Sequence, residues 1–165
     1  MESEKKENTN NQNGVVSSEI SALDVAKYLI GLAQRDGNPI TNLRLQKLLY
    51  YAWGTYWNIY KKHLFNDPIE AWDYGPVVRD VYIEYCESKK DELTLNSETI
   101  ALTDKKISKS IKEFLQAFFE KYKDISTYAL IKGSHEEAPW KETYKVGEKN
   151  IISQEKMEKF FNTIN

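Results

Sequence analysis

The segment over residues 41–60 constrains the fold most strongly, because its apolar side chains repeat at the spacing of a long α-helix. At about 100° per residue these side chains cluster on one broad arc, and Tyr51 falls on the other side. Thr41 is a suitable N-cap, since its hydroxyl can accept a hydrogen bond from an amide of the first turn. We therefore predict a central helix whose aromatic side chains face the core. The residues on the arc are Leu45, Leu48, Leu49, Ala52, Trp53, Tyr56 and Tyr60.

Gly54 lies inside this predicted helix. Glycine in a helix interior costs roughly 1 kcal/mol relative to alanine, and a glycine there indicates a close approach by another part of the chain. We expect another backbone to pack against the helix at this position.

A first helix is predicted before the central one. Ser21 and Asp24 have the spacing of a capping box, in which each side chain accepts the backbone amide of the other residue. The helix should run to about residue 34, and Gly37 and Pro39 follow it as terminating residues.

Three helices are predicted after residue 103. The clearest amphipathic pattern of the chain covers residues 104–122. Ser126 can cap the next helix, which should break near Gly133 and end before Pro139. Ser153 can cap the last one. The apolar positions of that last helix are Met157, Phe160, Phe161 and Ile164.

The stretch between the central helix and residue 103 gives mixed signals. Gly75 and Pro76 predict the start of a helix, because proline suits the first helical position, where its missing amide proton is not needed. Residues 91–103 alternate over a short range, a pattern compatible with a small hairpin and nearly as well with a loop.

Length and composition favour one folded unit. The chain has 165 residues, of which 41% are apolar and 29% charged, and a domain of this size can bury a sufficient core without disulfides. The predicted fold class is mainly α: a single compact helical domain of about six helices, with at most one short β-hairpin. It should span residues 20–165.

Residues 1–19 are mostly Glu, Lys, Asn, Gln and Ser, so they predict a disordered N-terminal tail. Deleting them should leave the melting temperature of the protein nearly unchanged, because almost no apolar area is lost. A thermal unfolding scan of both chains checks this. A drop of many degrees would show that the tail packs against the domain.

Charge and cysteine content bound the environment and the partners. The formal net charge of -2 argues against a phosphate-binding surface, so nucleic acid is an unfavoured partner for this domain. Cys86 has no second cysteine to pair with, which makes the cytoplasm the expected location. We found no signal-peptide pattern and no apolar run of membrane-spanning length, so no membrane partner is expected.

No arrangement of residues typical of catalysis stands out. His63, His135 and Cys86 lie far apart and lack metal-ligand spacing. The adjacent Glu136 and Glu137 are expected to be solvated. The sequence therefore predicts no metal site, no cofactor and no enzyme.

Three stretches resemble a known family. They read LQKLLYYAW over residues 45–53, EAWDYGPVV over residues 70–78 and SHEEAPW over residues 134–140. Together they resemble the Panacea domain, the family of SocA-like antitoxins and phage-associated proteins. The resemblance spans roughly residues 20–161.

The resemblance implies a protein that binds another protein. The expected partner is a cognate toxin encoded by an adjacent gene. Some related members hand the toxin to a protease instead, so a protease or chaperone is the second kind of partner that the resemblance implies. Exposed Trp and Tyr side chains suit such binding, because they offer large contact areas for few frozen torsions. The candidate partner-binding residues, transferred from the family's motifs or chosen as aromatic contacts, are Trp72, Tyr74, Gly75, Pro76, Val77, His135, Pro139 and Trp140.

Two alternatives stay open. The motif residues could pack inside the domain instead of touching a toxin, since buried aromatic motifs usually pack. The second functional hypothesis is a phage-associated or mobile-element-associated DNA-binding regulator, which would need a basic stripe on one helix.

Overall fold

The computed structural model describes residues 20–163, so the predicted tail over residues 1–19 and the predicted core position Ile164 lie outside the described residues. The described chain is mainly α-helical with a small three-stranded sheet, which confirms the predicted fold class, with eight α-helices in place of about six. No described helix is long and apolar enough to cross a membrane. In chain order the elements are α1 (Ala22–Arg35), α2 (Asn42–Tyr60), β1 (Ile69–Trp72), β2 (Gly75–Val77), α3 (Arg79–Tyr85), the 3₁₀-helix η1 (Cys86–Ser88), α4 (Ser97–Lys106), α5 (Lys109–Tyr122), α6 (Thr127–Glu136), α7 (Ala138–Lys141), β3 (Ile151–Ile152) and α8 (Gln154–Asn162).

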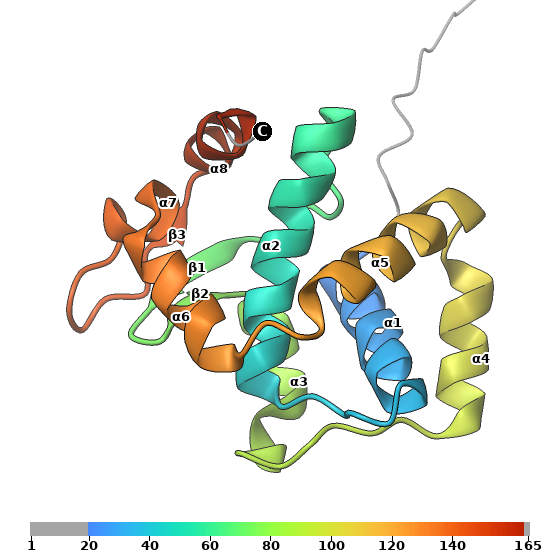
Figure 1. The fold of residues 1–165 in the computed structure, drawn as a ribbon. Helices are drawn as coiled ribbons and strands as arrows, with labels where there is room; N and C mark the ends of the chain where they lie inside the picture. Colours follow the sequence, from blue (N-terminus) through green and yellow to red (C-terminus); the bar gives the residue numbers. More distant parts are fainter. Residues whose placement is uncertain (1–19, 164–165) are drawn as a thin grey trace, which may run out of the picture.

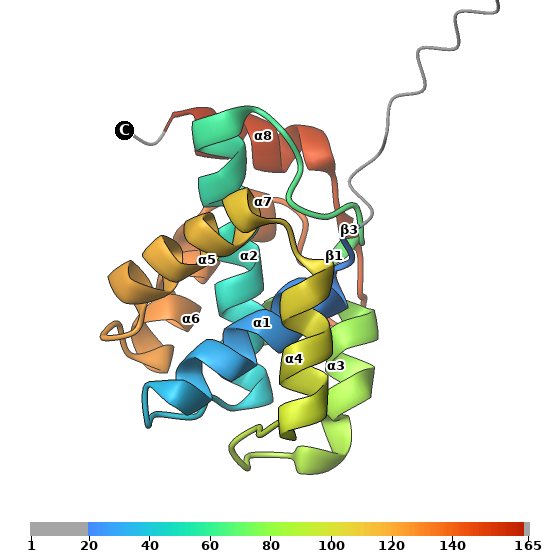
Figure 2. The same ribbon diagram turned by 90° about the vertical axis from the view of Figure 1, so that its right-hand side faces the viewer.

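Helix α2 lies in the middle of the fold. In Figure 1, α1, α4 and α5 lie on one side of it, and the sheet, α6, α7 and α8 lie on the other. Figure 2 shows α1 and α4 in front of α2. The helix is buried on all sides over residues 45–54, including Tyr51, whereas Tyr60 at its end is exposed. This burial also encloses the polar side chains of Gln46 and Lys47, which therefore need partners inside the protein.

Four predicted helix caps are confirmed. The Ser21 hydroxyl accepts the amide of Asp24 at 3.1 Å, and the Asp24 carboxylate accepts the amide of Ser21 at 3.1 Å. Thr41, Ser126 and Ser153 cap α2, α6 and α8 by accepting one backbone amide each. These side chains satisfy amides that have no partner within their own helix.

The prediction of a hairpin over residues 91–103 is wrong, and the alternative of a loop is confirmed for residues 91–96 alone. In place of a hairpin, the chain forms α4, because Asn96 acts as an N-cap and accepts an amide of the first turn at 2.8 Å. The predicted helix over residues 104–122 is divided accordingly. Helix α4 ends before Ile107, whose backbone is extended, and Ser108 then caps α5.

The predicted helix start at Gly75 and Pro76 is also wrong. These residues belong to β2, which runs antiparallel to β1 with Ala71 opposite Pro76 and Trp72 opposite Gly75. Strand β1 is central in the order β2-β1-β3, so β2 is an outer strand, where a proline without an amide proton is tolerated. Helix α3 starts only at Arg79.

Helix α6 continues through Gly133 to Glu136, so the predicted break near Gly133 is wrong. A Cβ atom at Gly133 would lie 3.0 Å from the Tyr51 hydroxyl, and the glycine therefore lets α6 approach α2 closely. The prediction that this helix ends before Pro139 is confirmed.

Arg44 fixes the connection between α5 and α6 to the start of α2. Its guanidinium donates to the carbonyl oxygens of Tyr122, Lys123 and Ile125 at 3.1, 3.1 and 2.6 Å, and to the Thr127 hydroxyl at 3.2 Å. These bonds satisfy carbonyl groups at the C-terminal end of α5 that lack partners within the helix. One side chain therefore holds three helices together.

Candidate functional site

The turn between β1 and β2, with the residue on each side of it, carries three of the predicted site residues, Trp72, Tyr74 and Gly75. Asp73 and Tyr74 form its tip, and Trp72 pairs with Gly75 across the hairpin. Gly75 has a φ of +109°, a conformation that strains residues with a side chain. Tyr74 is 68% exposed. The local sequence thus places a large aromatic side chain at the tip of a tight turn, here called the Tyr74 turn (residues 72–75).

Three stacked rings support the Tyr74 turn from behind. The ring centroids of His135 and Trp140 lie 4.1 Å apart, and those of Trp140 and Tyr144 lie 4.5 Å apart. The indole nitrogen of Trp140 donates to the carbonyl oxygen of Trp72 at 2.8 Å, and the Tyr144 hydroxyl donates to the Asp73 carboxylate at 2.5 Å. The stack therefore restrains both the backbone and the tip of the turn.

Two buried polar side chains of α2 hold the strand that follows. The ammonium of Lys47, which is 0% exposed, donates to the carbonyl oxygen of Pro76 at 2.9 Å, and Gln46 Oε1 accepts the amide of Val78 at 2.9 Å. A Cβ atom at Gly75 would lie 2.9 Å from Lys47 Cε, so the turn packs directly on the lysine. Burial lowers the pKa of Lys47 to about 7, because water no longer solvates the charged form.

Glu137 follows the last residue of α6 and is not solvated as predicted, although Glu136 is exposed. Its carboxylate oxygens accept hydrogen bonds from the hydroxyl groups of Tyr50 and Tyr51, with oxygen–oxygen distances of 3.0 and 3.1 Å. Burial raises the pKa of Glu137 to about 7, against the effect of these two hydrogen bonds. Burial and the neighbouring carboxylate raise the pKa of both tyrosines. The carboxylate thus ties the loop before Trp140 to α2.

His135 acts as a packing ring in this arrangement. Its Nε2 atom is buried and has no hydrogen-bond partner among the described residues. Burial and then the charge of Lys47 lower its pKa, while a hydrogen bond with the backbone of Asp73 acts in the opposite direction. No group of three His, Cys, Asp or Glu residues within positions 20–163 could hold a metal ion. His135 therefore contributes a neutral ring to the stack.

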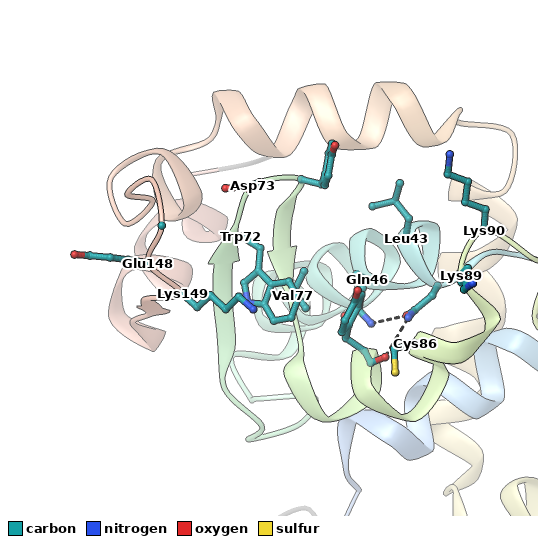
Figure 3. A pocket seen from close by; sticks show the side chains of 14 residues that line it. Leu43, Gln46, Trp72, Asp73, Val77, Cys86, Lys89, Lys90, Glu148 and Lys149 are labelled. Carbon is teal, nitrogen blue, oxygen red and sulfur yellow. Dashed lines mark hydrogen bonds between the residues drawn. The ribbon is translucent and has the colours of Figure 1, made fainter.

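A groove with a volume of about 630 Å³ opens beside the Tyr74 turn, bounded by the start of α2, by α3 and by η1 (Figure 3). Its wall is largely apolar and includes Trp72 and Val77 together with Leu43 and Tyr82, which are 39% and 37% exposed. The rings of Trp72 and Tyr82 meet edge to face at 4.8 Å between centroids. Apolar side chains are therefore accessible in a concave surface, which is the usual form of a binding site.

The eight site residues predicted from the motifs divide into two sets. Three of them line the groove: Trp72, Tyr74 and Val77. Of the others, Gly75 belongs to the Tyr74 turn and Pro76 follows it in β2. His135 and Trp140 belong to the ring stack behind the turn, and Pro139 is buried in α7 next to Trp140. The structure thus brings the two motifs together, although they are about sixty residues apart.

Sequence reasoning missed several groove residues. Leu43 lies outside the apolar arc of α2, and this isolated leucine was the available signal for an exposed apolar position. Tyr82 shares the helical spacing of the apolar residues Val78, Val81 and Tyr85, and this pattern does not distinguish exposed Tyr82 from buried Val81. Lys89, Lys90 and Lys149 complete the rim of the groove.

The fold and the site define a helical domain that presents a rigidly supported aromatic turn beside a groove. The family model "Antitoxin SocA-like, Panacea domain" matches residues 45–141, which include both motifs and the Tyr74 turn. The chain therefore belongs to the SocA-like antitoxin family with a Panacea domain.

A curated relative agrees with this family. The chain is 43% identical over 63 residues to Antitoxin SocA of Caulobacter vibrioides (strain NA1000 / CB15N). The match covers 38% of this chain and 34% of the relative, so the chain spans about a third of the length of that protein. No solved structure matches this chain.

Proposed function

We propose that this protein is an antitoxin that neutralises a cognate protein toxin, encoded by an adjacent gene, by binding it directly. The proposal includes a non-catalytic mode of action and places the contact at the Tyr74 turn and the groove beside it. Family membership supports the antitoxin role. A single domain over residues 20–165 would supply the contact surface.

The exposed but firmly supported Tyr74 is the observation that carries this proposal. Its ring is 68% exposed, while the backbone on both sides is held by Trp140 and Lys47. Binding to a surface that is already ordered loses little conformational entropy, and tyrosine is frequent among the residues that dominate protein interfaces. Tyr74 thus combines an exposed side chain with an ordered backbone, which is the combination expected of an interface residue.

Co-expression with the product of the adjacent gene tests the proposed function. We expect the neighbour to arrest bacterial growth alone, to be harmless together with this protein, and to co-purify with it. A harmless neighbour that does not co-purify would contradict the proposal and move the DNA-binding regulator to first place. If the antitoxin blocks the active site of the toxin, the two proteins should form a stable complex and the toxin level should stay unchanged. If it delivers the toxin to a protease, the toxin level should fall, and deleting the protease should restore it.

Replacing Tyr74 with alanine should weaken toxin binding at least about tenfold, which is a typical loss for an aromatic interface residue. The melting temperature should stay within about 1 °C of the wild type, because the exposed ring buries little area. Titration calorimetry of purified proteins measures the affinity. Tyr128→Ala is the matched control, since Tyr128 is 74% exposed and lies outside the groove. Equal affinities of both variants would place the interface elsewhere.

A further inference from the structure

The rim of the groove is positively charged, although the whole chain has a formal net charge of -2. Lys89, Lys90 and Lys149 all line the groove. Within residues 20–163 none of these three lysines forms an ion pair. Three ammonium groups are therefore available to a ligand.

Two carboxylates also line the groove, and within the described residues neither of them forms an ion pair with these lysines. Asp73 accepts the hydroxyl proton of Tyr144 at 2.5 Å, and Glu148 accepts the side-chain amide of Asn150 at 2.9 Å. Figure 3 shows Glu148 directed away from Trp72 and Val77, whereas Lys149 extends along the Trp72 ring. With three lysines against two carboxylates, the residues that line the groove carry a net formal charge of +1.

The apolar wall between the lysines suits a side chain better than a nucleic acid base. The ammonium of Lys149 lies 4.1 Å from the centroid of the Trp72 ring, and the edge of Tyr82 lies against the same ring. A base that stacks needs an open aromatic face, and these contacts occupy the Trp72 ring. Leu43 and Val77 instead offer aliphatic contacts.

We propose that this groove binds a short segment of the protein partner in which one aromatic or leucine side chain is flanked by carboxylates. The apolar side chain would lie against Leu43, Val77 and Tyr82, and the carboxylates would pair with Lys89, Lys90 and Lys149. The volume of about 630 Å³ lies within the range of pockets that bind a drug-sized ligand. The inference rests on the proposed function, because it specifies which part of a toxin the antitoxin holds.

A displayed library of randomised nine-residue peptides tests the groove without the toxin. We expect selection on the full-length protein to enrich peptides with an aromatic residue or leucine next to Asp or Glu. In fluorescence anisotropy, the double variant Lys89→Glu/Lys90→Glu should bind an enriched peptide at least about tenfold more weakly, because attraction becomes repulsion. Leu43→Gln should weaken the same peptide about fivefold through the apolar contact.

A second double variant serves as the control for the change of charge. Lys105→Glu/Lys121→Glu changes the net charge equally at exposed lysines outside the groove, and it should alter peptide affinity less than about twofold. Enriched peptides without acidic residues, equal binding to both double variants, or displacement of the peptide by a single-stranded oligonucleotide at equal concentration would overturn the inference. Co-purification of the toxin with Lys89→Glu/Lys90→Glu at wild-type affinity would also overturn it, while the proposed function would stand.

Discussion

Replacing Gly54 with alanine is expected to destabilise the protein by about 1–3 kcal/mol, although alanine is the better helix former. A Cβ atom at this position would overlap the ring of Phe161, which lies on α8 and packs against α2. Either the ring leaves its place or α8 moves away, and both disturb a tightly packed contact. Chemical denaturation followed by tryptophan fluorescence measures the loss.

A double-mutant cycle separates this steric effect from others. Phe161→Ala alone should cost about 3–5 kcal/mol, because a buried aromatic ring is removed and a cavity remains. In the Phe161→Ala background the Gly54→Ala change should become neutral or stabilise by up to about 1 kcal/mol. Additive losses would contradict the proposed overlap.

Other contacts keep α8 in place and bound the size of the effect. The indole nitrogen of Trp57 donates to Asn162 Oδ1 at 3.0 Å, and the His63 ring lies 2.7 Å from the Glu158 carboxylate. These contacts restrain α8 in its middle and at its C-terminal end, so Gly54→Ala should shift the helix without releasing it. The sequence predicts a close approach by another backbone at Gly54. The structure shows a close approach there, but by the side chain of Phe161.

Helix starts could be predicted because their signals are local. Ser126 and Ser153 each accept an amide only three residues ahead, so a short window of sequence contains the whole interaction. Asn96 offers the same local signal for α4, but the alternating pattern around it favours a hairpin. Apolar periodicity alone is ambiguous over such short segments.

The hairpin that carries the Tyr74 turn could not be predicted in this way. The groups that stabilise the strand conformation after Gly75 come from α2, about thirty residues earlier, where Gln46 and Lys47 bond the backbone of residues 76 and 78. A local reading of Gly75 and Pro76 favours a helix start equally well. Long-range hydrogen bonds decided between the two structures.

Part of the candidate site could be predicted from the sequence and part could not. Family motifs pointed to the residues of the turn and its support, because these form a fixed structural unit. The groove residues Leu43, Tyr82 and Lys149 come from three separate segments, and their shared surface exists only after folding. The position of Leu43 outside the apolar arc indicates exposure, but the partners with which it forms a surface are a property of the tertiary structure.

Replacing Lys47 with methionine is expected to abolish a rise in stability between pH 7 and pH 9. The buried ammonium has a pKa of about 7 in the folded protein, against its usual value of 10.5 in an unfolded chain. Between these two values the unfolded state binds more protons, so the free energy of unfolding increases with pH. The lysine should contribute about 2 kcal/mol to this increase from pH 7 to pH 9.

Glu137 acts in the opposite direction at lower pH. Its pKa is raised to about 7 from its usual value of 4.5, so the folded protein retains a proton that the unfolded chain loses. The resulting stabilisation is fully present below pH 4.5 and is lost as the pH rises through 7. Together, Lys47 and Glu137 should give the stability curve a shallow minimum near pH 7.

Urea denaturation at pH 7, 8 and 9 distinguishes the role of Lys47 from general charge effects. Lys47→Met leaves the Pro76 carbonyl oxygen without its donor, which lowers the free energy of unfolding by about 1–3 kcal/mol. The same change removes the desolvation cost of a buried charge. The stability of Lys47→Met should therefore be nearly independent of pH over this range. Lys121→Met, at an exposed lysine, should keep the full rise of the wild type. A rise of equal size in Lys47→Met would show that another group titrates. In Lys47→Met, Trp140 still holds the Tyr74 turn and Gln46 still holds the strand after it, so toxin affinity should change by less than about threefold. That result would exclude direct contact between Lys47 and the partner.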